Sequence, residues 1–223
     1  DLQKAAIGSK SGQPLIISID QEGGRVVRLP QATSFAGNMA IGATYLANGT
    51  KFATETSTVI AKELKLLGIN NNYAPVVDVN TNANNPVINT RSFGEDPQRV
   101  AELGAAAVNG FQEQGIMATL KHFPGHGDTH VDSHLGLPLV AHKLAVIEKN
   151  DIAPFQWAIK YSSPAMIMTA HIQYPALDDS TIENVSGDQI IRPATMSRKI
   201  LTGLLREQMG FDGIIATDAL DMA

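Results

Sequence analysis

The sequence IMATLK occupies residues 116–121, and it is apolar almost throughout before it ends in a charged side chain and His122. A strand that is buried on both faces shows such a continuous apolar run, whereas a half-buried strand alternates. This run therefore predicts one strand of a parallel sheet. Four further runs have the same character and predict four more strands: Pro14–Asp20, Tyr73–Val79, Ala165–His171 and Gly213–Asp218.

Segments of helical length separate these runs. Helices are expected over 52–67, 97–114, 143–161 and 197–209; Asp96-Pro97 is a typical helix start, and a glycine follows three of the four segments. Strand and helix thus alternate along the chain, and no change in composition marks a linker. The pattern predicts a single α/β domain over residues 1–223.

Nearly every predicted strand ends in a polar side chain, and this favours one α/β architecture over the other. An open doubly wound sheet binds its ligand at one switch point, whereas a (β/α)₈ barrel brings the carboxyl ends of all its strands to one mouth. We therefore expect a TIM-barrel type of fold. A complete barrel needs eight strands and ~250 residues, so five βα units predict a partial barrel that lacks its first and last strands. The strand-end residues are Asp20, Asp78, Lys121, His122, His171 and Asp218.

Composition excludes several classes of protein. The 223 residues are 43% hydrophobic and 17% charged, which is typical of a globular chain rather than a disordered one. The longest apolar runs fall far short of the ~20 residues of a membrane-spanning helix. The net charge is −5 and no segment carries a cluster of basic residues, so the sequence gives no sign of a nucleic-acid-binding surface. The absence of cysteine excludes disulfides and thiolate chemistry but leaves the compartment open, whether cytoplasmic or exported.

The stretch KHFPGHGDTHVDSH, residues 121–134, contains four of the six histidines and predicts a loop after a strand. It has three interpretations. One is a solvated polar loop. A second is a zinc or manganese site, built from the alternating residues His126, Asp128, His130, Asp132 and His134. The third, which we favour, is acid/base chemistry by His134, with Asp132 orienting its imidazole.

Asp218 ends an otherwise apolar run, and a carboxylate is seldom buried in such a run unless it is paired or has a function. It could cap a following helix, but its expected convergence with the other strand ends favours a catalytic role. Arg91 is similarly open: it could pair with Glu95 or Asp96, or it could bind a ligand.

Together these motifs resemble the bacterial β-N-acetylglucosaminidases of glycoside hydrolase family 3. The resemblance rests on the histidine-rich stretch 121–134 and on three shorter ones, DQEGG at 20–24, RSFG at 91–94 and TDAL at 217–220. It implies a TIM barrel that removes terminal β-linked N-acetylglucosamine, commonly from peptidoglycan fragments, with retention at the anomeric carbon and without a metal or cofactor. Segment 173–194 looks like an insertion found in longer, two-domain members, which implies that a C-terminal domain is missing from this chain.

The resemblance also implies roles for individual residues. Asp218 is the nucleophile, and His134 held by Asp132 is the general acid/base. The predicted substrate-binding residues are Asp20, Arg28, Arg91, Lys121, His122 and His171.

Three alternatives stay open. A glycoside phosphorylase would fit, because a histidine acid/base tolerates an incoming phosphate that a carboxylate would repel. A metal-dependent hydrolase could use the histidine-rich loop. A catalytically inactive sugar-binding module is the alternative outside the enzymes. The expected partner in each enzymatic case is an N-acetylglucosaminide or muropeptide, not nucleic acid.

Overall fold

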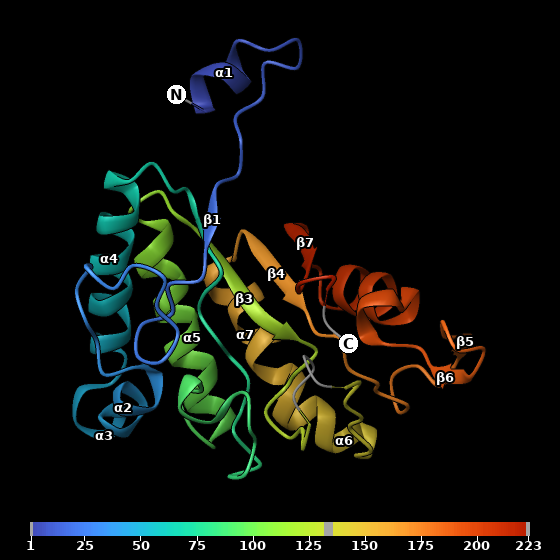
Figure 1. Ribbon diagram of the computed structural model, residues 1–223. Helices are drawn as coiled ribbons and strands as arrows, with labels where there is room; N and C mark the ends of the chain where they lie inside the picture. Colours follow the sequence, from blue (N-terminus) through green and yellow to red (C-terminus); the bar gives the residue numbers. More distant parts are fainter. Residues whose placement is uncertain (1, 132–135, 222–223) are drawn as a thin grey trace.

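The computed structural model describes residues 2–131 and 136–221. Its centre is a parallel sheet whose strands follow one another in chain order, β1-β2-β3-β4-β7 (Figure 1). Helices lie between successive strands and cover one side of this sheet. Five parallel strands in this order form half of a barrel, so the prediction of an incomplete TIM-barrel type of domain is confirmed. The strands are β1 (Ser18–Ile19), β2 (Asn71–Asn72), β3 (Met117–Phe123), β4 (Met166–Thr169) and β7 (Ile214–Thr217).

The four predicted helices all form. The first two are α4 (Lys51–Leu66) and α5 (Pro97–Gln112). The third predicted helix consists of three consecutive segments, α6 (Leu144–Ile147), the π-helical η2 (Glu148–Ile152) and α7 (Ala153–Ser162). The fourth is η4 (Lys199–Gln208), which is also π-helical. Shorter helices complete the set: α1 (Leu2–Ile7), α2 (Asn38–Ala43), α3 (Tyr45–Asn48), η1 (Asn89–Arg91) and η3 (Ala194–Met196).

The bounds predicted for the second strand were wrong. The run Tyr73–Val79 predicted a strand, but β2 lies just before it at Asn71–Asn72. Beyond β2 the run keeps backbone hydrogen bonds to β3, but it forms no regular ladder with β3, and its one bridge there joins Val76 to Lys121. Pro75 explains the interruption, because proline has no N–H to donate to a neighbouring strand. The segment beyond it is still buried, which is why its sequence has the composition of a strand.

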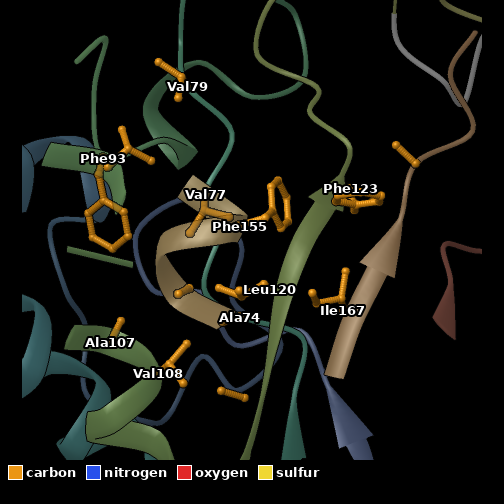
Figure 2. Packing of buried hydrophobic residues seen from close by; sticks show 14 of the residues in the cluster. Ala74, Val77, Val79, Phe93, Ala107, Val108, Leu120, Phe123, Phe155 and Ile167 are labelled. Carbon is orange, nitrogen blue, oxygen red and sulfur yellow. The ribbon is translucent and has the colours of Figure 1, made fainter. Parts of the chain in front are cut away.

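The hydrophobic core lies between the sheet and its covering helices (Figure 2). Leu120 of β3 and Ile167 of β4 are fully buried in it. Phe123 meets Phe155 of α7 edge to face, with ring centroids 5.2 Å apart. This packing fixes β3 against β4, and with them the strand ends that carry the polar residues.

Helices α4 and α5 pack so closely at Gly110 that a side chain there has no room. A β-carbon would lie 2.0 Å from Oγ of Ser57 and 2.8 Å from the carbonyl oxygen of Thr54. We expect Gly110→Ala to lower the free energy of unfolding by about 1–3 kcal/mol, measured by urea denaturation. Gly203→Ala in η4 is the matched control, because apart from its own helix backbone no atom lies within 4 Å of its β-carbon position. Equal effects of the two changes would contradict this account of the α4–α5 contact.

Segment 173–194 contains a hairpin that the sequence did not predict. Strands β5 (Thr181–Glu183) and β6 (Gln189–Ile191) pair antiparallel outside the main sheet. The side chain of Gln173 ties the hairpin to the end of β4 by donating to the carbonyl of Ile191. Across the described ranges, no helix is long and apolar enough to cross a membrane.

Candidate active site

The polar strand-end residues gather at the carboxyl edge of the sheet. Asp20 directly follows β1, Lys121 and His122 lie near the end of β3, and Asp218 directly follows β7. Parallel pairing places these ends side by side. Their contacts show which of the predicted residues meet.

Lys121 is the centre of a buried ion network. Its Nζ lies 2.7 Å from Oδ1 of Asp20 and 2.7 Å from Oε1 of Glu22. Arg91 binds the same glutamate in a bidentate manner, through Nη2 at 2.7 Å and Nε at 2.9 Å. The side chains of Lys121 and Glu22 are only 2% and 1% exposed. The network therefore joins residues that lie up to 101 positions apart in the sequence.

The charges of this network compensate one another. Burial raises the pKa of Glu22, but the positive charges and hydrogen bonds of Lys121 and Arg91 outweigh burial and lower that pKa to about 2. The same carboxylate outweighs the effect of burial on Arg91 and raises the pKa of its guanidinium. Glu22 thus stays ionised at neutral pH, and it holds both cations in place at the mouth of the half-barrel.

His122 is oriented by a buried carboxylate. Oδ2 of Asp78 lies 2.7 Å from Nδ1 of His122, and because a carboxylate can only accept, Nδ1 is the donor. Oδ1 accepts from the backbone N–H groups of His122 and His126, at 3.1 and 2.8 Å. Burial raises the pKa of Asp78, but His122 and these hydrogen bonds lower it further than burial raises it. The other ring nitrogen, Nε2, then points into the site.

Asp218 lies beside that nitrogen. Its Oδ2 is 4.0 Å from Nε2 of His122, and its Oδ1 accepts from the backbone N–H of Ala219 at 2.8 Å. Burial raises the pKa of Asp218, yet His122, this hydrogen bond and Lys121 together leave it below its ordinary value. Asp218 is therefore an ionised carboxylate that is 23% exposed, which is the state that a nucleophile requires.

Arg91 pairs with Glu22, and not with either acid proposed from its neighbourhood in sequence. Asp96 instead caps α5, since its side chain accepts from the N–H groups of Gln98 and Arg99. The alternative of a local ion pair for Arg91 is therefore wrong.

The remaining predicted binding residues differ in position. Nε2 of His171 lies 3.0 Å from the carbonyl oxygen of Ala219, next to Asp218. Arg28 is exposed, and within the described ranges its side chain makes no ion pair or hydrogen bond. The structure brings Asp20, Arg91, Lys121, His122, His171 and Asp218 together, but it does not bring the side chain of Arg28 into their network.

The predicted acid/base residues, Asp132 and His134, lie outside the described residues. The preceding part of the loop is anchored: Asp128 lies 2.5 Å from Nε2 of His142, and Asn82 contacts Nδ1 of His130 at 3.2 Å. His126 is buried, and burial lowers its pKa to about 4. Nδ1 of His126 lies 2.7 Å from Oγ1 of Thr129, so these three residues of the alternating set contact different groups. No three potential metal ligands meet in the described part of the chain.

Two residues of the network are not among the predicted site residues. Glu22 lies in the quoted stretch DQEGG, yet only the fold reveals its pairing with Arg91, 69 positions away. Asp78 is one of the expected strand-end residues, but only the fold reveals that its carboxylate orients His122.

Comparison with known proteins decides the family. The model of the glycosyl hydrolase family 3 N terminal domain matches residues 1–223. The chain belongs to this family. It is 60% identical over its whole length to beta-hexosaminidase A of Pseudoalteromonas piscicida, of which it spans 38%. It thus covers less than two thirds of the length of these curated relatives, with shares that range from 36% to 60%.

Solved structures of this family have the same fold. A family 3 beta-N-acetylglucosaminidase from Paenibacillus sp. str. FPU-7 superimposes with a TM-score of 0.89 at 45% identity, over 99% of this chain and 39% of that one. Native NagZ from Neisseria gonorrhoeae gives a TM-score of 0.83 at 35% identity, over 94% of this chain and 58% of that one. The half-barrel is therefore similar to part of each of these enzymes.

Proposed function

We propose that this chain is the partial catalytic barrel, over residues 1–223, of a retaining β-N-acetylhexosaminidase that releases terminal β-linked N-acetylglucosamine. The observation that carries the proposal is the ionised Asp218, which lies 4.0 Å from the oriented imidazole of His122 at the edge of a buried ion network. The names of its relatives, a beta-hexosaminidase and a beta-N-acetylglucosaminidase, support the choice of sugar.

The chemistry is a double displacement. A carboxylate oxygen of Asp218 attacks the anomeric carbon and forms a glycosyl ester, while the bond from that carbon to the leaving oxygen breaks. His134 donates its proton to the leaving oxygen, and Asp132 holds the imidazole. In the second step His134 takes a proton from water, whose oxygen attacks the anomeric carbon and releases Asp218. Two inversions give net retention.

The ion network supplies the sugar contacts. Asp20 is 34% exposed and keeps acceptor capacity beyond its bond to Lys121. His122 presents Nε2, and Arg91, 13% exposed, presents the edge of its guanidinium. We assign these groups with Lys121 to the hydroxyls and the acetamido group of the terminal sugar, and His171 and Arg28 to positions nearer the rim. Because the network is fixed before the sugar arrives, binding energy is used for orientation. Peptidoglycan fragments are the natural substrate we propose.

Kinetics on a pair of substrates test the proposal. Nitrophenyl β-N-acetylglucosaminide should react at least about 100-fold faster, in kcat/KM, than the β-glucoside, because a site built around the acetamido group loses those contacts with glucose. The full polypeptide should release free N-acetylglucosamine whether phosphate is present or not. Equal rates on the two substrates would contradict the assignment of the sugar.

The same assay separates the alternatives. A phosphorylase would form a sugar 1-phosphate when phosphate is added. A metal-dependent hydrolase would lose activity to a chelator and regain it with the metal. We expect neither result, and an inactive sugar-binding module would show no turnover of either substrate.

A further inference from the structure

Asn85 is a buried polar residue that the proposed reaction does not use. It lies in the loop after β2, is 1% exposed, and faces the histidine-rich loop after β3. The two loops pack so closely that a β-carbon at Gly127 would lie 1.7 Å from the carbonyl oxygen of Val79. A polar side chain in such a place is costly unless its donors and acceptors have partners. The partners of Asn85 therefore indicate its role.

The amide of Asn85 is bonded to both loops. Its Oδ1 accepts from the backbone N–H groups of Val87 and Ile88, each at 2.8 Å. Its Nδ2 donates to the carbonyl oxygen of His126 at 2.7 Å and lies 3.3 Å from Oγ1 of Thr129. Because the amide nitrogen can only donate and a carbonyl oxygen can only accept, these partners allow one orientation of the amide. The position requires a side chain that has both a donor and an acceptor.

The acceptor side of the amide supports Arg91. The turn that Asn85 fixes supplies two backbone carbonyls to this arginine. The carbonyl of Val87 accepts from Nη1 of Arg91 at 3.2 Å, and the carbonyl of Ile88 accepts from its backbone N–H at 2.8 Å. Arg91 in turn binds Glu22 in the buried ion network. A shift of this turn would therefore move the guanidinium in the site.

The donor side of the amide supports His122. His126, whose carbonyl accepts from Nδ2, donates its own backbone N–H to Oδ1 of Asp78 at 2.8 Å. Oδ2 of the same carboxylate lies 2.7 Å from Nδ1 of His122 and orients its ring. The two sides meet again in the site, where Nη2 of Arg91 lies 3.5 Å from Nε2 of His122. That ring nitrogen is 4.0 Å from Oδ2 of Asp218.

We propose that Asn85 is a positioning residue that bridges the loops after β2 and β3 and so sets the guanidinium of Arg91 and the imidazole of His122 relative to each other at the sugar site. The inference rests on the proposed function, since it concerns the same active site. In a barrel the strands form the scaffold and the loops carry the site. Without the bridge the two loops could shift separately, and a displacement of about 1 Å costs about 100-fold in rate.

The test uses the full polypeptide and kcat/KM on an activated aryl N-acetylglucosaminide. Asn85→Ala removes both sides of the bridge, and we expect kcat/KM to fall by about 10- to 100-fold. Asn85→Leu has the same branching as asparagine but no polar atom, so it fills the space without the hydrogen bonds. We expect a loss in the same range, because the bonds and not the volume of the side chain position the loops.

Asn70→Ala is the matched control. Asn70 makes the same two kinds of bond, since its Oδ1 accepts from the N–H of Ile17 at 2.7 Å and its Nδ2 donates to the carbonyl of Leu15 at 2.9 Å. It directly precedes β2, at the amino edge of the sheet and away from the site. We expect Asn70→Ala to lower the melting temperature but to leave kcat/KM within about twofold of wild type.

A second readout does not depend on activity. The proton on Nδ1 of His122 is bonded to the buried carboxylate of Asp78. NMR of the ¹⁵N-histidine-labelled polypeptide should show it as a low-field resonance that disappears in His122→Gln. We expect this resonance to shift in Asn85→Ala and in Asn85→Leu, and to keep its position in Asn70→Ala. A side chain that only stabilised the fold would not move it.

Three results would each overturn the proposal: a folded Asn85→Ala with kcat/KM within about twofold of wild type, an Asn85→Leu with full activity, or a His122 resonance that shifts in neither variant. A different result would separate this proposal from the proposed function. A wild type without glycosidase activity, whose His122 resonance still shifts in Asn85→Ala, would refute the proposed function and leave the bridge by Asn85 established.

Discussion

Asp218→Asn should lower kcat/KM on an activated aryl N-acetylglucosaminide by at least about 10⁴-fold, with an unchanged circular dichroism spectrum. The amide has nearly the same shape as the carboxylate, but it cannot form the glycosyl ester. The hydrogen bond from Ala219 can be kept by the amide oxygen, and the side chain is partly exposed, so folding should tolerate the change.

Asp212→Asn is the matched control, because this aspartate is exposed and precedes β7, at the opposite end of the strand. Its activity should stay within about twofold of wild type, as expected of an exposed residue away from the site.

Azide can then test the role of Asp218 directly. In Asp218→Ala it should occupy the vacated face and attack the anomeric carbon, giving the α-glycosyl azide with an activated substrate. Normal turnover by Asp218→Asn would exclude Asp218 as the nucleophile.

The sequence was most informative where fold and function have the same physical cause. Parallel strands that are buried on both faces must be apolar, so a polar residue at the end of such a run is conspicuous. Parallel pairing then brings these ends to one edge, and for this reason Asp20, Lys121, His122 and Asp218 could be predicted as one site. The fold class followed from the same runs.

The partners of these residues could not be predicted in the same way. Glu22 binds Arg91 across 69 positions, whereas Asp96, five positions from Arg91, caps a helix. Local sequence offered only Glu95 and Asp96 as acidic partners for Arg91, since it contains no information about which loops meet.

Glu22→Gln should have the largest effect on stability among changes at the site. It removes the one charge that Lys121 and Arg91 share, and leaves a cation that is 2% exposed with only the half-exposed Asp20. Breaking a buried pair on one side typically costs 3–5 kcal/mol, because the remaining charge is uncompensated. We expect a loss of about 3 kcal/mol in the free energy of unfolding at pH 7, measured by urea denaturation. Sugar binding should weaken with it, since both cations lose their anchor.

The pH dependence of this loss identifies its electrostatic origin. The pKa of Glu22 is about 2 in the fold against an ordinary value of 4.5, so its contribution to stability is present above pH 4.5 and is lost as the pH falls toward 2. The difference in the free energy of unfolding between wild type and Glu22→Gln should therefore be smaller at pH 3 than at pH 7. Glu55→Gln is the control: its ion pair with Lys51 is exposed, and we expect a change below about 0.5 kcal/mol at either pH. If the loss of unfolding free energy in Glu22→Gln did not change with pH, the glutamate would act through packing. Its charge would then not be what holds Lys121 and Arg91 in the site.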